Sequence, residues 1–76
     1  MVRQLTGRII SLQEDRFRLA TDDGQVVLLT LAPSAGLDAT TLADWQRRGV
    51  RLDVRLSGEP NLAGGVARLL QEAAGA

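Results

Sequence analysis

Cysteine, histidine and tyrosine are all absent from the 76 residues of the chain. Without cysteine, neither a disulfide bond nor a thiolate metal site can form. Without histidine, the chain lacks the most common metal ligand and the most common general base at neutral pH, so a Ser-His-Asp triad is excluded. The carboxylates show no spacing that indicates a catalytic constellation. We therefore expect a protein that is not an enzyme and that binds no cofactor and no metal ion.

Lysine is also absent, so arginine supplies all nine basic residues, and nine acidic residues balance them to a formal net charge of zero. A neutral chain has no overall field that attracts phosphate backbones or anionic lipids. Arginine forms planar, bidentate contacts that lysine cannot form, although a GC-rich coding sequence produces the same preference. Charge alone therefore indicates no class of partner.

Long hydrophobic runs are missing as well. No apolar run approaches the ~18 residues of a membrane span, and no hydrophobic leader follows Met1. A chain of this length holds one hydrophobic core. The expectation is a single soluble domain over residues 1–76, located in the cytoplasm.

Residues 3–13 predict one long strand whose apolar alternation changes phase partway. The apolar set lies first on one face and then on the other: Leu5, Gly7 and Ile9, then Ile10 and Leu12. A glycine followed by such a change predicts a bulge or a sharp bend near Gly7. A strand that bends in this way can serve two parts of a closed sheet.

The next two strands are predicted over residues 17–21 and 26–31, and the loop between them decides which side chains share a face. A two-residue turn at Asp23-Gly24 would place Phe17 and Leu19 with Val26, Leu28 and Thr30. A three-residue loop over 22–24, with Gly24 in the left-handed conformation, would place the same two residues with Val27, Leu29 and Leu31. The second register gathers the larger apolar set on one face, so we favour it.

The favoured register has a consequence for the outer surface of this hairpin. It leaves Val26 and Leu28 outside, beside Arg16 and Arg18. Apolar side chains bordered by arginine are typical of a surface that meets another protein.

Residues 38–49 predict the only helix. Asp38 can cap its N-terminus, arginines lie in its last turn, and Gly49 suits a left-handed stop. Leu42 and Trp45 lie three residues apart on one face, so we expect them to plug one end of a barrel. A ligand-stacking role for Trp45 is the other interpretation.

Two further strands are predicted near the end of the chain. Residues 50–56 alternate between apolar and charged side chains, which is the pattern of a strand with one buried face. Residues 66–71 are predicted as the last strand, although their composition also permits a helix. The intervening stretch, "SGEPNLAGG" at 57–65, reads as a loop and lacks the Lys-Ser/Thr of a phosphate-binding loop.

These elements follow the order β-β-β-α-β-β, an all-β chain with one short helix. The layout resembles the oligonucleotide/oligosaccharide-binding (OB) fold, a small five-stranded Greek-key barrel. Four features carry the resemblance: Gly7 in the long first strand, "TDDG" at 21–24, the helix at 38–49, and the loop at 57–65. The resemblance implies a ligand surface on the outer face of strands two and three, flanked by the loop after the first strand and by the loop at 57–65.

Two functions compete on this layout, because a fold alone does not determine a function. The leading hypothesis is a non-catalytic module that binds a partner protein, or a second copy of itself, through Arg16, Arg18, Val26 and Leu28. The alternative is single-stranded nucleic-acid binding along one side of the barrel through Arg8, Arg16, Arg18, Arg51 and Arg55. Single-strand binders of this fold add exposed aromatic residues, whereas Phe17 and Trp45 are both expected in the core here.

Overall fold

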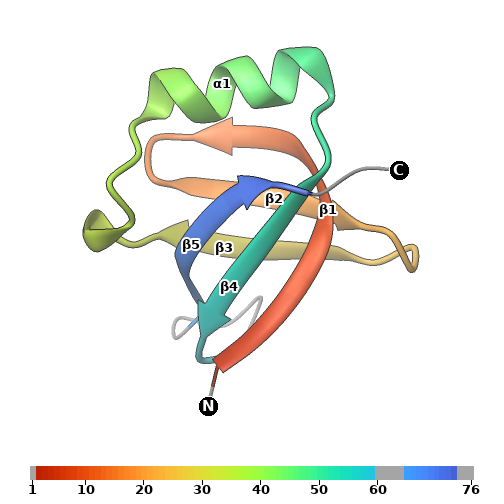
Figure 1. The fold of residues 1–76 in the computed structure, drawn as a ribbon, viewed down its shortest axis with the longest axis vertical. Helices are drawn as coiled ribbons and strands as arrows, with labels where there is room; N and C mark the ends of the chain where they lie inside the picture. The colour runs from red at the N-terminus through yellow and green to blue at the C-terminus, as the bar shows by residue number, and fades with distance from the viewer. Residues whose placement is uncertain (1, 60–64, 74–76) are drawn as a thin grey trace.

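The computed structural model describes residues 2–59 and 65–73, which form a closed five-stranded β-barrel with one helix lying across one end (Figure 1). In chain order the elements are β1 (Val2–Gln13), β2 (Arg16–Thr21), β3 (Val26–Leu31), the 3-10 turn η1 (Pro33–Ala35), α1 (Ala39–Arg48), β4 (Leu52–Ser57) and β5 (Val66–Glu72). The predicted order β-β-β-α-β-β is confirmed, and residues 66–72 form a strand rather than a helix. Residues 60–64 of the predicted loop at 57–65 lie outside the described residues.

Around the barrel the strands follow the order β1, β2, β3, β5, β4 and return to β1. Every neighbouring pair is antiparallel except β3 and β5, which run parallel. Within the described residues, the parallel contact consists of Thr30 opposite Val66 and Leu31 opposite Ala67. The amide of Thr30 donates to the carbonyl of Gly65 at 3.0 Å, and the amide of Ala32 donates to that of Ala67 at 2.9 Å.

The long strand β1 serves two neighbours, as its pattern predicted. Its first half pairs with β4 and its second half with β2, and Gly7 pairs with Leu52 on one side and Thr21 on the other. A Cβ atom at Gly7 would overlap the carbonyl group of Ala20. The absence of a side chain at this position therefore allows β1 and β2 to approach closely where β1 turns from one neighbour to the other.

The bulge in β1 lies at Ile10, three residues after the glycine. The register with β2 shifts between Ile9 and Ser11, and Ile10 is 48% exposed. The prediction that Ile10 and Leu12 share a face is wrong, because the extra residue shifts the alternation by one. Leu12 lies opposite Phe17 and packs against the core.

The hairpin of β2 and β3 has the favoured register. Leu19 lies opposite Val27 and Arg18 opposite Leu28, so the loop contains three residues, 22–24. Gly24 has a φ of 92°, and its amide donates to the carbonyl of Thr21 at 3.0 Å. The two-residue turn is therefore wrong, and the larger apolar set faces the core.

The helix α1 closes one end of the core, as its pattern predicted. The Asp38 carboxylate accepts a hydrogen bond of 2.9 Å from the amide of Thr41, and Gly49 ends the helix with a φ of 66°. Leu42 and Trp45 are buried in the core cluster. The indole is 8% exposed, so it does not form an exposed stacking platform.

The strand predicted over 50–56 begins at Leu52, because the amide of Val50 completes the end of the helix by donating to the carbonyl of Trp45 at 3.0 Å. In the part of the chain that the structure describes, no helix has the length and apolar character needed to cross a membrane.

Gly7→Ala should destabilise the fold strongly, because the new methyl group would force β1 and β2 apart. We expect the free energy of unfolding to fall by about 3 kcal/mol, at the upper end of overpacking effects. Gly24→Ala is the matched control. Its new Cβ atom would meet no neighbouring atom, so the variant should lose only about 1–2 kcal/mol, which is what an alanine costs in the left-handed backbone conformation. Urea unfolding followed by Trp45 fluorescence measures both variants. A Gly7→Ala variant as stable as Gly24→Ala would show that the close approach relaxes at little cost.

Candidate partner-binding face

The second half of β1 lies beside β2 and β3, and the outward side chains of these three strands form one continuous surface, which we call the β2 face. The strand register arranges nine residues in three rows across it: Gln13, Arg16 and Thr30; Ser11, Arg18 and Leu28; Arg8, Ala20 and Val26. The residues of β2 and β3 between these positions point inward and are buried. The nine residues include no aspartate and no glutamate.

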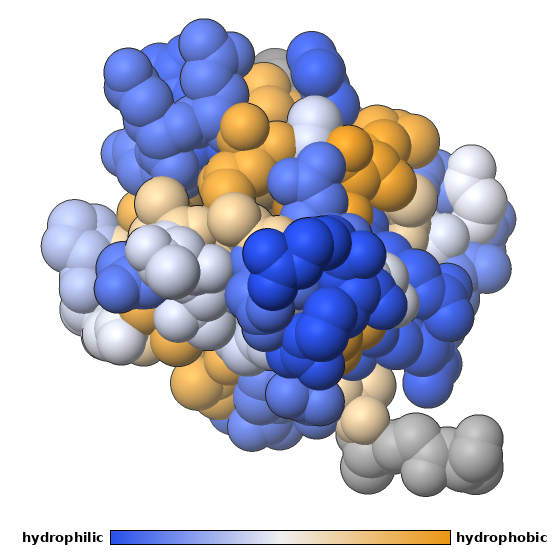
Figure 2. All heavy atoms as spheres, turned by 90° about the horizontal axis from the view of Figure 1, so that it is seen from above, coloured by the Kyte–Doolittle hydropathy of each residue, from blue (hydrophilic) through white to orange (hydrophobic). Residues whose placement is uncertain are grey.

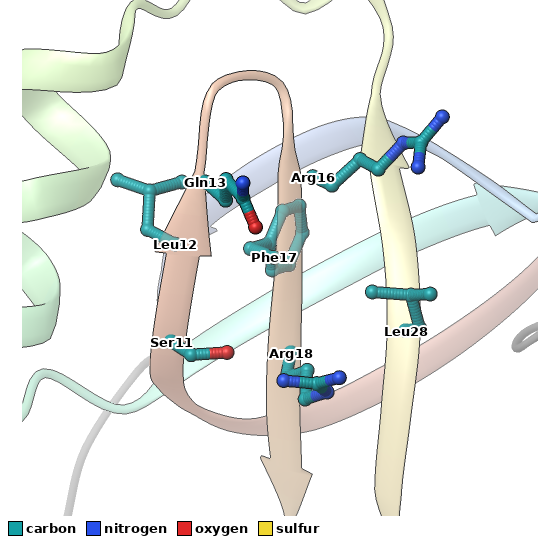
Figure 3. A pocket seen from close by; sticks show the side chains of 7 residues that line it. All are labelled: Ser11, Leu12, Gln13, Arg16, Phe17, Arg18 and Leu28. Atoms are coloured by element: carbon teal, nitrogen blue, oxygen red, sulfur yellow. The ribbon is translucent and has the colours of Figure 1, made fainter.

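A shallow hollow of about 240 Å³ lies on the β2 face (Figure 3). Its lining comes from three strands: Ser11, Leu12 and Gln13 of β1, Arg16, Phe17 and Arg18 of β2, and Leu28 of β3. In Figure 3 the Arg16 side chain extends from β2 toward β3, whereas Leu12 points toward the helix. Besides Leu12 and Phe17, the hollow therefore has polar groups on β1, cationic groups on β2 and an aliphatic group on β3.

Arg16 and Arg18 are exposed, and neither forms an ion pair within residues 2–59 and 65–73. They lie two residues apart on one face of β2, so their backbone positions are about 6.8 Å apart along the strand. Among the described residues, two arginines without carboxylate partners thus project from the same face of β2.

Arg51 and Arg8, in contrast, are engaged elsewhere. Arg51 donates two hydrogen bonds to the carboxylate of Asp22, one of them from Nε at 2.7 Å. This pairing lowers the pKa of Asp22 and raises that of Arg51, and the charge of Arg8 also lowers the pKa of Asp22. Arg8 itself donates from Nε to the carbonyl of Gly49 at 3.0 Å.

Arg55 lies in the other half of the barrel. It projects from β4 between Gln4 of β1 and Leu69 of β5 and lines a separate hollow of about 260 Å³ there. The structure thus does not gather the five arginines of the nucleic-acid hypothesis on one face. Arg16 and Arg18 remain adjacent, Arg8 lies at the edge of their surface, and Arg51 is held by Asp22.

The aliphatic part of the predicted site is accessible. Val26 is 53% exposed and Leu28 is 38% exposed, both on β3 beside the arginines. Figure 2, which views the molecule from the α1 end, shows that hydrophobic surface remains exposed between strongly hydrophilic side chains. Phe17 and Trp45, the only aromatic residues of the chain, are 1% and 8% exposed, so the β2 face presents no aromatic ring.

Ser11 and Gln13 line the hollow but are not among the residues that the sequence predicted for the site. Their place on the β2 face depends on the bulge at Ile10, which the sequence pattern put near Gly7. The apolar alternation changes phase between Ile9 and Ile10. A bulge predicted at Ile10 from this change would have placed Ser11 and Gln13 on the outer surface of the barrel.

A third hollow, of about 570 Å³, lies between α1 and the turn that follows β1, with Leu12, Ala39 and Ala43 among its lining residues. Its Asp44 already pairs with Arg47 and Arg48. Within residues 2–59 and 65–73, no three carboxylates gather as a possible metal site.

Neither the family models, the curated proteins nor the solved structures contain a match to the chain.

Asp22→Asn should make the stability less sensitive to acid. Arg51 lowers the folded-state pKa of Asp22, so the unfolded chain takes up this proton more readily. The stabilisation is present above the ordinary aspartate pKa of about 3.9 and is lost as the pH falls through the folded-state value. The difference in unfolding free energy between wild type and Asp22→Asn should therefore be largest near about pH 6 and shrink toward about pH 2.

Urea unfolding at a series of pH values measures this difference. Asp23→Asn is the matched control, because the Asp23 carboxylate accepts a hydrogen bond from the Thr21 hydroxyl rather than from an arginine. The same pH dependence in both variants would contradict the role assigned to the Asp22–Arg51 pair.

Proposed function

We propose that the protein is a non-catalytic interaction module with an OB-like layout, and that it binds a partner protein through the β2 face. The observation that carries the proposal is the exposure of Val26 and Leu28 next to two arginines that have no carboxylate partner among the described residues. Arginine and exposed aliphatic groups are a combination that protein interfaces use.

The layout supports the OB-like part of the proposal. Five strands close a barrel, a helix between the third and fourth strands covers one end, and β1 is shared between two neighbours. The resemblance implies ligand binding on the outer face of β2 and β3, and the hollow of about 240 Å³ lies on that face.

The aliphatic side chains contribute binding affinity through the burial of apolar surface. Full burial of a valine or leucine contributes about 1.5–3 kcal/mol, so covering the exposed parts of Val26 and Leu28 contributes about 1 kcal/mol each. The arginines orient the bound partner, because the planar donors of a guanidinium bind best to acceptors that match their geometry.

Single-stranded nucleic acid is the second candidate. The acid-free composition of the nine residues on the β2 face and the adjacency of Arg16 and Arg18 favour it. Base stacking on aromatic rings, worth about 1–3 kcal/mol per base in single-strand binders, has no counterpart here because both aromatic residues are buried. We therefore place it second.

A photocrosslinking amino acid at position 26 should capture a specific partner in cells that express the protein. The matched position is Gln71, which is exposed on β5 in the other half of the barrel. We expect an adduct of defined mass from position 26 and none from position 71. Leu28→Asp should remove the adduct, whereas Leu69→Asp, at a side chain of similar exposure, should not.

The mass of the adduct and light scattering of the purified protein separate a foreign partner from a second copy of the chain. Equal capture from both positions, or capture that survives Leu28→Asp, would refute docking on the β2 face.

A fluorescent oligothymidylate of about 20 nucleotides tests the second candidate at low ionic strength. Docking of a protein on the β2 face implies no rise in anisotropy. A rise that weakens steeply with salt and is abolished in the Arg16→Gln/Arg18→Gln double variant would assign the face to nucleic acid instead.

A further inference from the structure

We infer that the partner presents to the β2 face an extended acidic segment, in which carboxylates alternate with other residues and an aliphatic residue follows at the next alternate position. This inference rests on the proposed function and names the chemistry of the occupant. It follows from the spacing of the arginines, the order of side chains along β2 and the position of acidic residues around the face.

The spacing of the two arginines along β2 matches that of alternate residues in an extended chain. Arg16 and Arg18 project from the same side of β2, and their backbone positions are about 6.8 Å apart, which is also the separation of alternate residues in any extended chain. A segment that lies along β2 in extended form therefore brings two carboxylates, two residues apart, within reach of the two arginine side chains. Charge-assisted pairs of this kind are among the stronger hydrogen bonds of proteins, and neither arginine has such a pair with a described residue.

The order of side chains along β2 gives the third position. The row of Arg16 is polar on both sides, with Gln13 and Thr30, whereas the row of Arg18 already includes Leu28. The following row contains Ala20 and Val26 beside Arg8, whose Nε donates to the carbonyl of Gly49. Along β2 and β3 the side chains thus change from cationic to aliphatic over three alternate positions. The complementary segment carries acid, acid and aliphatic side chains at positions i, i+2 and i+4.

A second copy of the chain does not fit this face. A symmetric contact would bring the same cationic surface of two molecules together. Because none of the nine residues of the β2 face is acidic, no carboxylate on that face would compensate the repulsion.

A long polyanion fits less well than a short acidic segment. Glu14 and Asp15 are exposed in the turn before β2, and Asp23 is exposed in the turn after it. A run of negative charges along the whole strand would meet these carboxylates at both ends, whereas two carboxylates over Arg16 and Arg18 would stay away from Asp23. The charge pattern thus limits the acidic part of the ligand to the first half of β2.

Fluorescent peptides test the inference with the full chain. The probe is Thr-Glu-Thr-Glu-Thr-Leu-Thr, together with its reversed sequence, because the direction of the segment is not specified by the side chains. One control replaces both glutamates by glutamine. The other, Thr-Thr-Glu-Glu-Leu-Thr-Thr, has the same composition but points adjacent glutamates to opposite sides of an extended chain.

We expect one direction of the probe to bind with a Kd below about 1 mM, and both control peptides to bind about tenfold more weakly. Arg16→Gln/Arg18→Gln should weaken binding about tenfold as well. Arg3 and Arg55 lie in the other half of the barrel, where Arg3 pairs with Glu59 at 3.4 Å. Arg3→Gln/Arg55→Gln removes the same charge as the first double variant and should change binding less than twofold. Thermal unfolding checks that both double variants fold; Arg16 and Arg18 make no ion pair with a described residue that folding could lose.

Each other outcome overturns the inference in a distinguishable way. If the glutamine peptide binds as well as the probe, or neither direction binds, the segment is not acidic, and capture from position 26 still decides whether a protein docks there. Equal weakening in the two double variants would show general charge attraction. Displacement of the probe by oligothymidylate at lower concentration than by unlabelled probe would assign the arginines to nucleic acid and remove both proposals.

Discussion

The sharing of β1 between two neighbours is the constraint on which the rest of the structure depends. Gly7 pairs with β4 on one side and with β2 on the other, and a side chain there would collide with the carbonyl of Ala20. Because the second half of β1 runs beside β2, its outward residues Ser11 and Gln13 lie next to the exposed arginines. The candidate binding face is thus a consequence of how the barrel closes, since the second half of β1 leaves β4 and pairs with β2.

Much of the fold could be predicted because it depends on patterns that extend over a few residues. Asp38 and Gly49 mark the ends of α1, and the amount of apolar surface decided between a two-residue and a three-residue loop after β2. The bulge could not be located in this way. A phase change after Gly7 is compatible with a bend at the glycine or with an extra residue later, and the choice depends on the contact of Leu12 with Phe17 across the strands.

The candidate site was predictable in part for the same reason. The period of a strand and the hairpin register place Arg16 and Arg18 beside Val26 and Leu28, but they do not show which arginines already have partners. Arg51 meets Asp22, 29 residues earlier in the chain, and Arg8 meets a carbonyl group 41 residues later. The net charge of zero therefore does not reveal how charge is distributed over the surface. Folding pairs some of the nine arginines with carboxylates and leaves Arg16 and Arg18 without such a pair among the described residues.

The parallel contact of β3 with β5 gives the barrel a seam. Two opposed residue pairs form this contact within the described residues, whereas β1 is paired along both of its halves. Local opening of a folded protein begins where few interactions cross between elements. The seam's strand β3 is also the strand that carries Val26 and Leu28. A ligand that bound only the closed barrel through these side chains would stabilise the contact of β3 with β5 by mass action.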